Sequence, residues 1–266
     1  MSVPERFIDF YAGLDSQRRV LFALVVRNVM MRFGRQNFGF FWIVLEPMIL
    51  TVSVLYLWSF IHASYEHGMS LVGFVFTGYM PLTLYRHLSN SGVHLFRTSA
   101  NLLYHPGVTL LDIFTARMIL EFCGTSVAFM VVYLSLLCLG LLQPFARPDL
   151  LVWGWISYAV LSASIGLVFA ILTEYWETSE RFIPPLQYIS LPLSGTFFMV
   201  DWLPTYVQKF VLFSPVIHCN EMIRAGLFGE AIQTHYWIFY PMAWGLVNFA
   251  IALYFLDRWK EYFKLF

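Results

Sequence analysis

The chain of 266 residues contains few charges, and long stretches of it contain none. Asp, Glu, Lys and Arg together make up 12% of the residues, against roughly 25% in soluble domains. Six stretches of 19 residues or more carry no charge at all, namely 47–65, 67–85, 122–146, 150–173, 182–200 and 231–256. A helix of about 20 residues crosses a ~30 Å hydrocarbon core. The sequence therefore predicts an all-α polytopic membrane protein with six transmembrane helices.

A nucleotide-binding loop is also missing. The P-loop that holds ATP phosphates has the pattern GxxxxGK[ST], in which a lysine follows a glycine. The chain has three lysines, Lys209, Lys260 and Lys264, and none of them follows a glycine. We therefore expect no cofactor in this chain. An ATP-driven activity would need ATP and magnesium on a partner subunit.

Catalytic and metal-binding patterns are absent from the sequence as well. The seven histidines form no HExxH motif, and Cys123, Cys138 and Cys219 are not in a metal-ligand spacing. No Asp/His cluster typical of a membrane-bound glycosyl- or acyltransferase is present. The first apolar stretch, 20–31, contains Arg27 and no small-residue cleavage site, which argues against a signal peptide. We expect no catalytic residue and no metal site.

Isolated charges deep within the apolar stretches are missing too. An ion-coupled carrier needs carboxylates within its spans and commonly has inverted repeats, and the sequence shows no internal repeat. Glu121 follows Arg117 by four residues, so the two can pair on one helix face. Glu221 and Arg224 are three residues apart. A structural role is the main interpretation of both pairs, whereas Glu46 is open between a structural and a functional role.

The basic residues lie mostly on one side of the predicted membrane. If the first span runs outward and the others alternate, 13 basic residues fall on the inner side and 3 on the outer side. The inner set is Arg6, Arg18, Arg19, Arg27, Arg32, Arg35, Arg86, Arg97, Arg117, Arg181, Arg258, Lys260 and Lys264, and the outer set is Arg147, Lys209 and Arg224. The positive-inside rule then predicts a multi-pass plasma-membrane protein with both termini in the cytoplasm.

The expected membrane domain covers residues 41–256, with spans at about 41–63, 71–89, 112–142, 150–173, 182–200 and 236–256. Residues 1–40 are amphipathic and predict a helix in the inner interface, with its arginines toward lipid headgroups. A cytoplasmic helix packed on the bundle is the alternative. Segments 202–213 and 216–228 are too short to span and predict re-entrant helices. Residues 257–266 form a cytoplasmic tail.

Aromatic residues are abundant, at 19% of the chain. Aromatic rings can contact the C–H faces of sugars without holding them in deep hydrogen-bonded sites. The residues Tyr56, Trp58, Tyr79, Tyr85 and Tyr188 are therefore candidates to line a polysaccharide path. Each of them also fits a place in the core or in the interfacial aromatic belt.

The stretch 32–47, RFGRQNFGFFWIVLEP, resembles the start of the membrane domain in ABC-2 type permeases, the membrane subunits of ABC exporters. It most resembles the branch that exports capsular polysaccharide in Gram-negative bacteria. The similarity covers nearly the whole chain and continues through Tyr104-His105-Pro106, Asp112, Arg117 and Glu121, and through the stretch 214–218, SPVIH, with Glu221 and Arg224. Relatives often have Asn where this chain has Ser214.

The resemblance implies a homodimeric permease that works with two ABC ATPase subunits and moves a glycolipid-capped polysaccharide across the inner membrane. It places a coupling helix between spans two and three, whose ATPase-docking residues would be Phe96, Arg97, Leu102, Leu103, Tyr104 and His105. The approach to the first span would be formed by Arg32, Arg35, Phe38, Trp42 and Glu46. The outer short helices would cap the exit with Pro215, His218, Glu221 and Arg224.

The implied partners are a second copy of the chain, the two ATPases, the polysaccharide and membrane lipids, with a periplasmic or outer-membrane export adaptor as a further candidate. No nucleic acid is implied. Within the same superfamily, O-antigen, teichoic acid, a lipid or a drug stay open as cargo. An ion-coupled secondary carrier is the alternative from another class.

Overall fold

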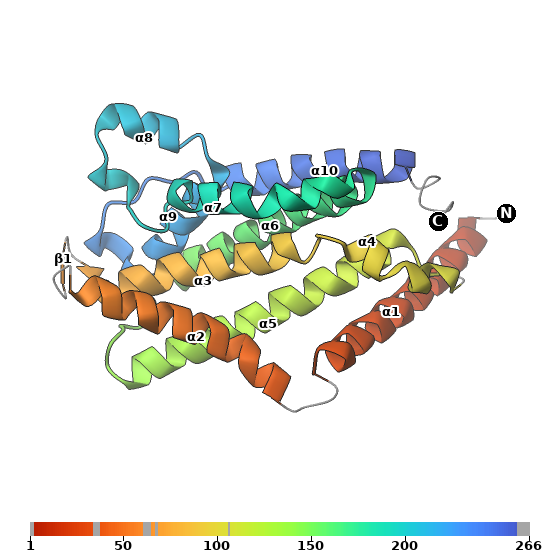
Figure 1. Cartoon of the computed structure of the whole chain (residues 1–266), viewed down its shortest axis with the longest axis horizontal. Helices are drawn as coiled ribbons and strands as arrows, with labels where there is room; N and C mark the ends of the chain where they lie inside the picture. Colours follow the sequence, from red (N-terminus) through yellow and green to blue (C-terminus); the bar gives the residue numbers. More distant parts are fainter. Residues whose placement is uncertain (1–2, 34–37, 61–64, 67–68, 106, 260–266) are drawn as a thin grey trace.

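The computed structural model describes residues 3–33, 38–60, 65–66, 69–105 and 107–259, and these form a bundle of α-helices (Figure 1). The expected all-α class is confirmed. The long helices are α1 (Val3–Phe33), α2 (Phe38–Ser59), α3 (Leu71–Asn90), α5 (Leu110–Cys138), α6 (Pro148–Tyr175) and α10 (Tyr240–Trp259). Two short antiparallel strands, β1 (Tyr65–Glu66) and β2 (Met69–Ser70), lie between α2 and α3.

Short helices connect the long ones. They are α4 (Leu95–Thr98), η1 (Ala100–Tyr104), η2 (Glu177–Arg181), α7 (Ile183–Leu193), η3 (Val200–Trp202), α8 (Thr205–Val211), α9 (Pro215–Phe228) and η4 (Gly229–Ala231). In Figure 1, α4 and the last turns of α10 lie at one end, which we call the α4 end. The strand β1 and α8 lie at the opposite end, which we call the α8 end.

Within the described part of the chain, two helices combine the length and the mean hydropathy of a membrane span. They are α5, with 29 residues, and α6, with 28. The helices α2, α3 and α10 have 22, 20 and 20 residues, and are each about 30 Å long. Six spans therefore stay a prediction.

The expected continuous helix over 182–200 is wrong in its extent. The helix α7 has only 11 residues and is roughly 16 Å long, too short to cross a bilayer. Pro192 removes a backbone donor near its end, and Gly195 turns the chain with a left-handed φ of 79°. The hydroxyls of Ser194 and Thr196 are hydrogen-bonded at 2.7 Å across this turn.

Local sequence explains where the other helices begin. Ser70 caps α3, and its hydroxyl accepts the Gly73 N–H at 3.1 Å. Thr109 and Asp112 form a reciprocal capping box at the start of α5. Proline stands in the first turn of α6 and of α9, where its missing N–H costs no helical hydrogen bond.

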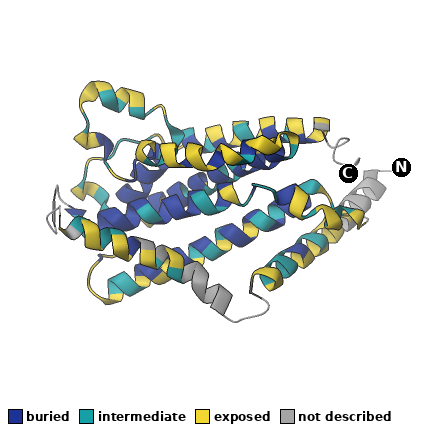
Figure 2. Ribbon diagram, viewed as in Figure 1, coloured by how far each residue is buried: buried dark blue, intermediate teal, exposed yellow. Residues whose placement is uncertain are grey.

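The core lies along α3, α6 and α9, where buried residues concentrate (Figure 2). The turn that follows α3 packs directly on the backbone of α6. A Cβ added to Gly92 would lie 1.9 Å from the Gly166 carbonyl oxygen, so only glycine allows this approach. Buried hydroxyls of Thr77, Ser89 and Ser162 donate to carbonyls one turn earlier in their own helices.

The helix α1 packs along α5 through two polar contacts, and Leu24 is buried between them in sequence. Gln17 Nε2 donates to Asp112 Oδ1 at 3.3 Å, and Arg32 Nη1 lies 2.6 Å from Glu121 Oε1. Phe22 on the same helix is 71% exposed. Arg32 thus differs from the expectation that the arginines point toward lipid headgroups, because it finds a buried carboxylate on α5.

Candidate functional site

A cavity of about 420 Å³ lies among α1, α2, α3, α5 and α7. It is lined by Arg32, Glu46, Tyr79, Leu82, Thr83, Arg86, His87, Asn90, Ser91, Arg117, Glu121, Leu191 and Phe197. Its three arginines and two glutamates leave one positive charge in excess when the histidine is neutral. Charged groups at the depth of a membrane helix are costly and are usually retained for function.

Glu121 is the centre of this charged group, and its side chain is only 5% exposed. Its carboxylate lies 2.6 Å from Arg32 Nη1, 3.3 Å from Arg117 Nε and 3.8 Å from His87 Nδ1. Glu46 joins the group 4.0 Å from the other nitrogen of His87. The predicted pairing of Arg117 with Glu121 is confirmed.

Sequence reasoning missed the wider charged group. Arg32 and Glu121 are 89 residues apart in the chain, and no local spacing connects them. His87 was not singled out either, because a lone histidine between apolar stretches gives no signal. Arg86 also lines a second cavity of about 130 Å³, together with Gln187 and Tyr188. The amide of Gln187 donates to Ser89 Oγ at 3.1 Å and thereby joins α7 to α3.

A row of aromatic rings leads from this cavity toward the α8 end, and we call it the aromatic row. Tyr79 and Phe197 line the cavity, and their ring centroids are 5.8 Å apart. The row continues from Phe197 to Trp58 at 6.3 Å, to Phe74 at 5.7 Å and to Trp202 at 5.1 Å. Of the candidate path residues, Trp58 and Tyr79 belong to the row.

The other three candidate path residues lie elsewhere. Tyr56 is 65% exposed and meets the edge of Phe60 at 5.0 Å. Tyr85 is buried in the core next to Tyr158, with ring centroids 6.3 Å apart. Tyr188 is exposed on α7 beside the smaller cavity.

Phe74, Phe197 and Trp202, the remaining members of the row, were not predicted. They lie far apart in the sequence, and Phe74 and Phe197 stand in charge-free stretches that hold many other aromatic residues. Only their packing distinguishes them.

The predicted docking residues differ widely in exposure. Phe96 is 2% exposed and anchors α4 in the core, whereas Leu102 and Leu103 are half-buried. Tyr104 is 78% exposed and His105 is also exposed. A groove of about 930 Å³ beside this segment is lined by Phe96, Arg97, Ala100, Leu103, Tyr104, Val108, Thr109, Leu110, Leu111, Glu174, Glu177, Leu253, Leu256 and Asp257. The surface open to a partner is thus formed mainly by η1 and the residue after it.

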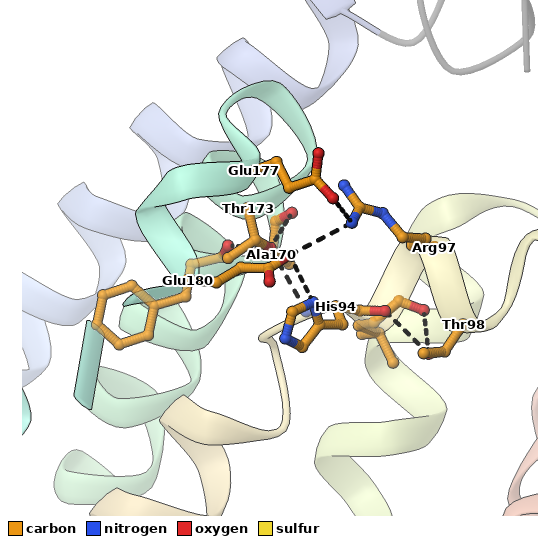
Figure 3. Close-up of polar contacts among 9 residues, drawn as sticks. His94, Arg97, Thr98, Ala170, Thr173, Glu177 and Glu180 are labelled. Carbon is orange, nitrogen blue, oxygen red and sulfur yellow. Dashed lines mark hydrogen bonds and ion pairs between the residues drawn. The ribbon is translucent and has the colours of Figure 1, made fainter. Parts of the chain in front are cut away.

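Arg97 takes part in an ion-pair cluster that connects the α4 segment to η2 (Figure 3). Its Nη1 atom lies 3.1 Å from Glu177 Oε1 and 3.4 Å from Glu180 Oε1. His94 Nδ1 lies 2.8 Å from the same oxygen of Glu180, and the His94 N–H donates to Thr173 Oγ1 at 3.4 Å. We call His94, Arg97, Glu177 and Glu180 the α4–η2 cluster. His94 has a left-handed φ of 58°, which is uncommon outside glycine.

At the α8 end, α9 is buried from Ile217 to Leu227. Arg224 is fully buried, and its guanidinium donates to the carbonyls of Phe198 and Thr196 at 2.7 and 3.0 Å. It also lies 4.5 Å from the centre of the Phe74 ring. The predicted partner, Glu221, has a carboxylate oxygen 3.8 Å away. Pro215 begins the helix. Because Arg224 and Glu221 bind backbone groups of the neighbouring loops, α9 holds these loops together and is not a free surface helix.

Burial sets the charge states in α9. It raises the pKa of Glu221, while Arg224 and the N–H groups of His235 and Val200 oppose the rise. Burial lowers the pKa of Arg224 to about 10, so it stays charged at neutral pH. Burial also lowers the pKa of His218. Since His218 Nδ1 accepts the Trp237 N–H at 3.0 Å, its Nε2–H donates to the Leu212 carbonyl at 2.8 Å.

Some predicted residues cannot be placed. Arg35 lies outside the described residues. Phe38 and Trp42 belong to α2, but their side chains lie outside the described set. Among the residues that are described, no group of three His, Cys, Asp or Glu side chains could hold a metal ion.

Comparison with known proteins identifies the family. Residues 19–228 match the family described as ABC-2 type transporter. The chain is 33% identical to the capsule polysaccharide export inner-membrane protein CtrC of Neisseria meningitidis serogroup B, over 95% of this chain and 96% of that protein. It is 31% identical to the protein BexB of Haemophilus influenzae, which has the same descriptive name, over 85% of each chain. It is 23% identical to the polysialic acid transport protein KpsM of Escherichia coli, over 90% of this chain and 95% of that one. The chain therefore belongs to the ABC-2 type transporter family.

Proposed function

We propose that this chain is the permease subunit of an ATP-driven exporter that moves capsular polysaccharide across the inner membrane. It acts as a transport component, and ATP and Mg²⁺ bind the partner ATPase. The observation that carries the proposal is the charged cavity that continues into the aromatic row. The printed names of CtrC and BexB support the cargo.

The cavity has the chemistry of a cargo site. Its excess positive charge suits an anionic group on a glycolipid or an acidic sugar. In the aromatic row beyond it, Phe197 and Trp202 are 36% and 40% exposed and can contact sugar rings, while Phe74 is buried and supports them from within the core. A charged start followed by an aromatic path favours a sugar polymer over a wholly apolar cargo.

Two copies of the chain form the conduit. The helices α2 and α7 border the cavity on either side of α3, and both carry exposed apolar residues such as Val52, Leu57, Leu186 and Ile189. A second copy that covers these faces would enclose the two cavities and the two aromatic rows. In this arrangement the α4 end and both termini are cytoplasmic, and α8 and α9 lie at the exit.

The ATPase docks at the α4 segment and η1, through the exposed Tyr104 and His105. ATP binding draws the two ATPases together, and their motion passes through this segment and α1 to α2, α3 and α7. The interface between the two copies then opens, and the glycolipid-capped polysaccharide moves across the membrane.

The proposal is tested by deleting the gene in its host and measuring polysaccharide on the cell surface. We expect surface polysaccharide to be lost while polymer accumulates inside, and to return with the wild-type gene on a plasmid. The purified chain should also bring a P-loop ATPase with it. Normal surface polysaccharide in the deletion strain would contradict the cargo, and absence of an ATPase partner would contradict the class of transporter.

A variant of the aromatic row tests the path itself. Phe197→Ala removes the ring between Tyr79 and Trp58, and Phe197→Tyr keeps it. Since aromatic contacts contribute about 0.5–1.5 kcal/mol, we expect Phe197→Ala to reduce export two- to tenfold with assembly intact. Phe197→Tyr should export normally. Equal export by both variants would remove the aromatic row from the path.

A further inference from the structure

We propose that His94 and Arg97 are positioning residues for transport, which link the ATPase-docking segment to α7 through Glu177 and Glu180. The inference rests on the proposed function, because it assigns a route from the ATPase contact to the cavity wall. The four side chains come from two segments about 80 residues apart in sequence, and Figure 3 shows them facing one another across the gap between α4 and η2.

The α4 segment is fixed to α6 independently of the cluster. The turn before α4 packs on the α6 backbone at Gly92 and Gly166. Leu95 and Phe96 are buried, at 7% and 2% exposure. The His94 N–H reaches Thr173 in the last turns of α6. A displacement of the docking segment therefore moves the end of α6 with it.

The helix α7 is not held in the same way. At Trp176 the backbone is extended, with φ −135° and ψ 96°, so α6 and α7 are not one continuous helix. The helix α7 follows η2 directly in the chain and is joined to α3 by the hydrogen bond from Gln187 to Ser89. Glu180 precedes the first residue of α7 by only three positions. The segment η2 packs on the end of α6, and the α4–η2 cluster ties it to the docking segment as well, so the cluster contributes to the place of α7 relative to α6.

The cavity wall lies at the far end of this route. The 11-residue helix α7 carries Gln187 and Tyr188 to the smaller cavity and Leu191 to both cavities. Because a short helix moves as a rigid unit, a shift of η2 changes the width of the cavity at Leu191. The α4–η2 cluster thus links the position of α7 to the position of the docking segment.

The exposure of the cluster separates this role from a purely structural one. The side chains of Arg97 and Glu177 are 43% and 78% exposed, and ion pairs of this kind contribute little to folding stability. Reversal of the Arg97 charge should therefore leave the fold in place while it repels η2. If the pair of Arg97 and Glu177 were merely structural, its loss would change neither folding nor transport.

The test compares Arg97→Glu with the charge swap Arg97→Glu/Glu177→Arg, in the full chain assembled with its ATPase partner in nanodiscs and in cells. The structure directs the Arg97 guanidinium to Glu177 and Glu180 and leaves Tyr104 and His105 exposed for docking. For Arg97→Glu we therefore expect copurification with the ATPase, a Tm within about 3 °C of wild type and continued ATP hydrolysis. Export should fall at least about tenfold, the size of a typical coupling between two sites. The swap should restore export to within about threefold of wild type.

Two further variants complete the design. Arg147→Glu is the matched control, because Arg147 pairs with Asp149 at 3.0 Å at the other end of α6, and it should export normally. Glu180→Gln changes the cluster from the η2 side, outside the proposed docking residues, and should uncouple export from ATP hydrolysis as Arg97→Glu does.

Three outcomes would overturn the proposal: normal export by Arg97→Glu or Glu180→Gln, loss of ATPase binding in Arg97→Glu, or a swap that assembles but does not restore export. Loss of binding would make Arg97 a docking residue. A wild-type chain that neither binds an ATPase nor supports export would overturn the proposed function as well. If the wild type and the variants are all fully active, only the proposed role of the α4–η2 cluster is overturned.

Discussion

The Glu121 carboxylate is shared by guanidinium groups from two helices, Arg32 on α1 and Arg117 on α5. A buried charge needs partners because its desolvation is costly. Here one carboxylate compensates for two cations at the wall of the cavity, and His87 lies within 3.8 Å. Removal of this carboxylate would leave the partly buried positive charges of Arg32 and Arg117 facing one another.

We expect Glu121→Gln to lower stability by about 2–3 kcal/mol. This is below the roughly 3–5 kcal/mol of a fully buried pair, because the side chains of Arg32 and Arg117 are 30% and 33% exposed. Thermal unfolding of the detergent-solubilised chain measures the change. Glu230→Gln, at an exposed position of η4, is the control and should unfold as wild type does. An unchanged Tm for Glu121→Gln would show that the arginines find water instead.

Arg224 gives a second prediction for a single residue. Its two guanidinium nitrogens donate to two different carbonyls, those of Phe198 and Thr196. The single ammonium of lysine cannot reproduce this fork, so Arg224→Lys leaves a buried carbonyl without a donor, at a cost of about 1–3 kcal/mol. We expect a lower Tm and less chain in the membrane fraction. Lys209→Arg, on the exposed helix α8, should have no effect, and equal behaviour of the two variants would refute the structural role of Arg224.

Among the helices and turns, the close approach of the α3–α4 turn to α6 depends on two glycines. We expect Gly92→Ala to push the turn away from α6 and to cost about 1–3 kcal/mol, as overpacked cores do, because its Cβ would meet the Gly166 carbonyl at 1.9 Å. Gly13→Ala is the control, since no atom lies within 4 Å of a Cβ at that position of α1. The control should be stabilised by roughly 0.5–1 kcal/mol. Thermal unfolding distinguishes the two variants, and similar shifts would contradict the close packing.

How far an element could be predicted depended on whether its signal was local. The charge-free stretches predicted α3 at 71–89 and α6 at 150–173, close to the observed Leu71–Asn90 and Pro148–Tyr175. Hydropathy could not locate the end of α7 at Leu193, because the residues after it are equally apolar. Its end depends on backbone geometry at Pro192 and Gly195, which hydropathy does not report.

On the scale of the whole molecule, the proposed second copy over α2 and α7 gives a crosslinking prediction. In a chain whose three cysteines are replaced, Val52→Cys on α2 should form disulfide-linked dimers in membranes on mild oxidation. Val247→Cys on α10 is the matched control, because the two valines are 59% and 54% exposed, and it should stay monomeric. Crosslinks through Val247→Cys and none through Val52→Cys would place the interface on the other side of the bundle.

The site is formed by helices that are distant in sequence, and this limited how much of it could be predicted. The family resemblance indicates Arg32 and Glu46, and a helical spacing indicates Glu121. No sequence pattern indicated that they meet, because they come from three different helices. The aromatic row was harder still, since Trp58 and Tyr79 looked like any interfacial aromatics until Phe197, from the loop after α7, placed them on one surface.

The contact between Gly92 and Gly166 also has a mechanical consequence. Backbone packed on backbone has almost no compliance, because close-packed protein interiors are hardly compressible. The docking segment and α6 should therefore respond together and without delay. The helix α1, by contrast, is joined to α5 through the long side chains of Gln17 and Arg32, which bend easily. In the proposed assembly, a pull from the ATPase would displace α6 rigidly and at once, and would displace α1 more softly and later. The route through α6 and the route through α1 should therefore differ in timing.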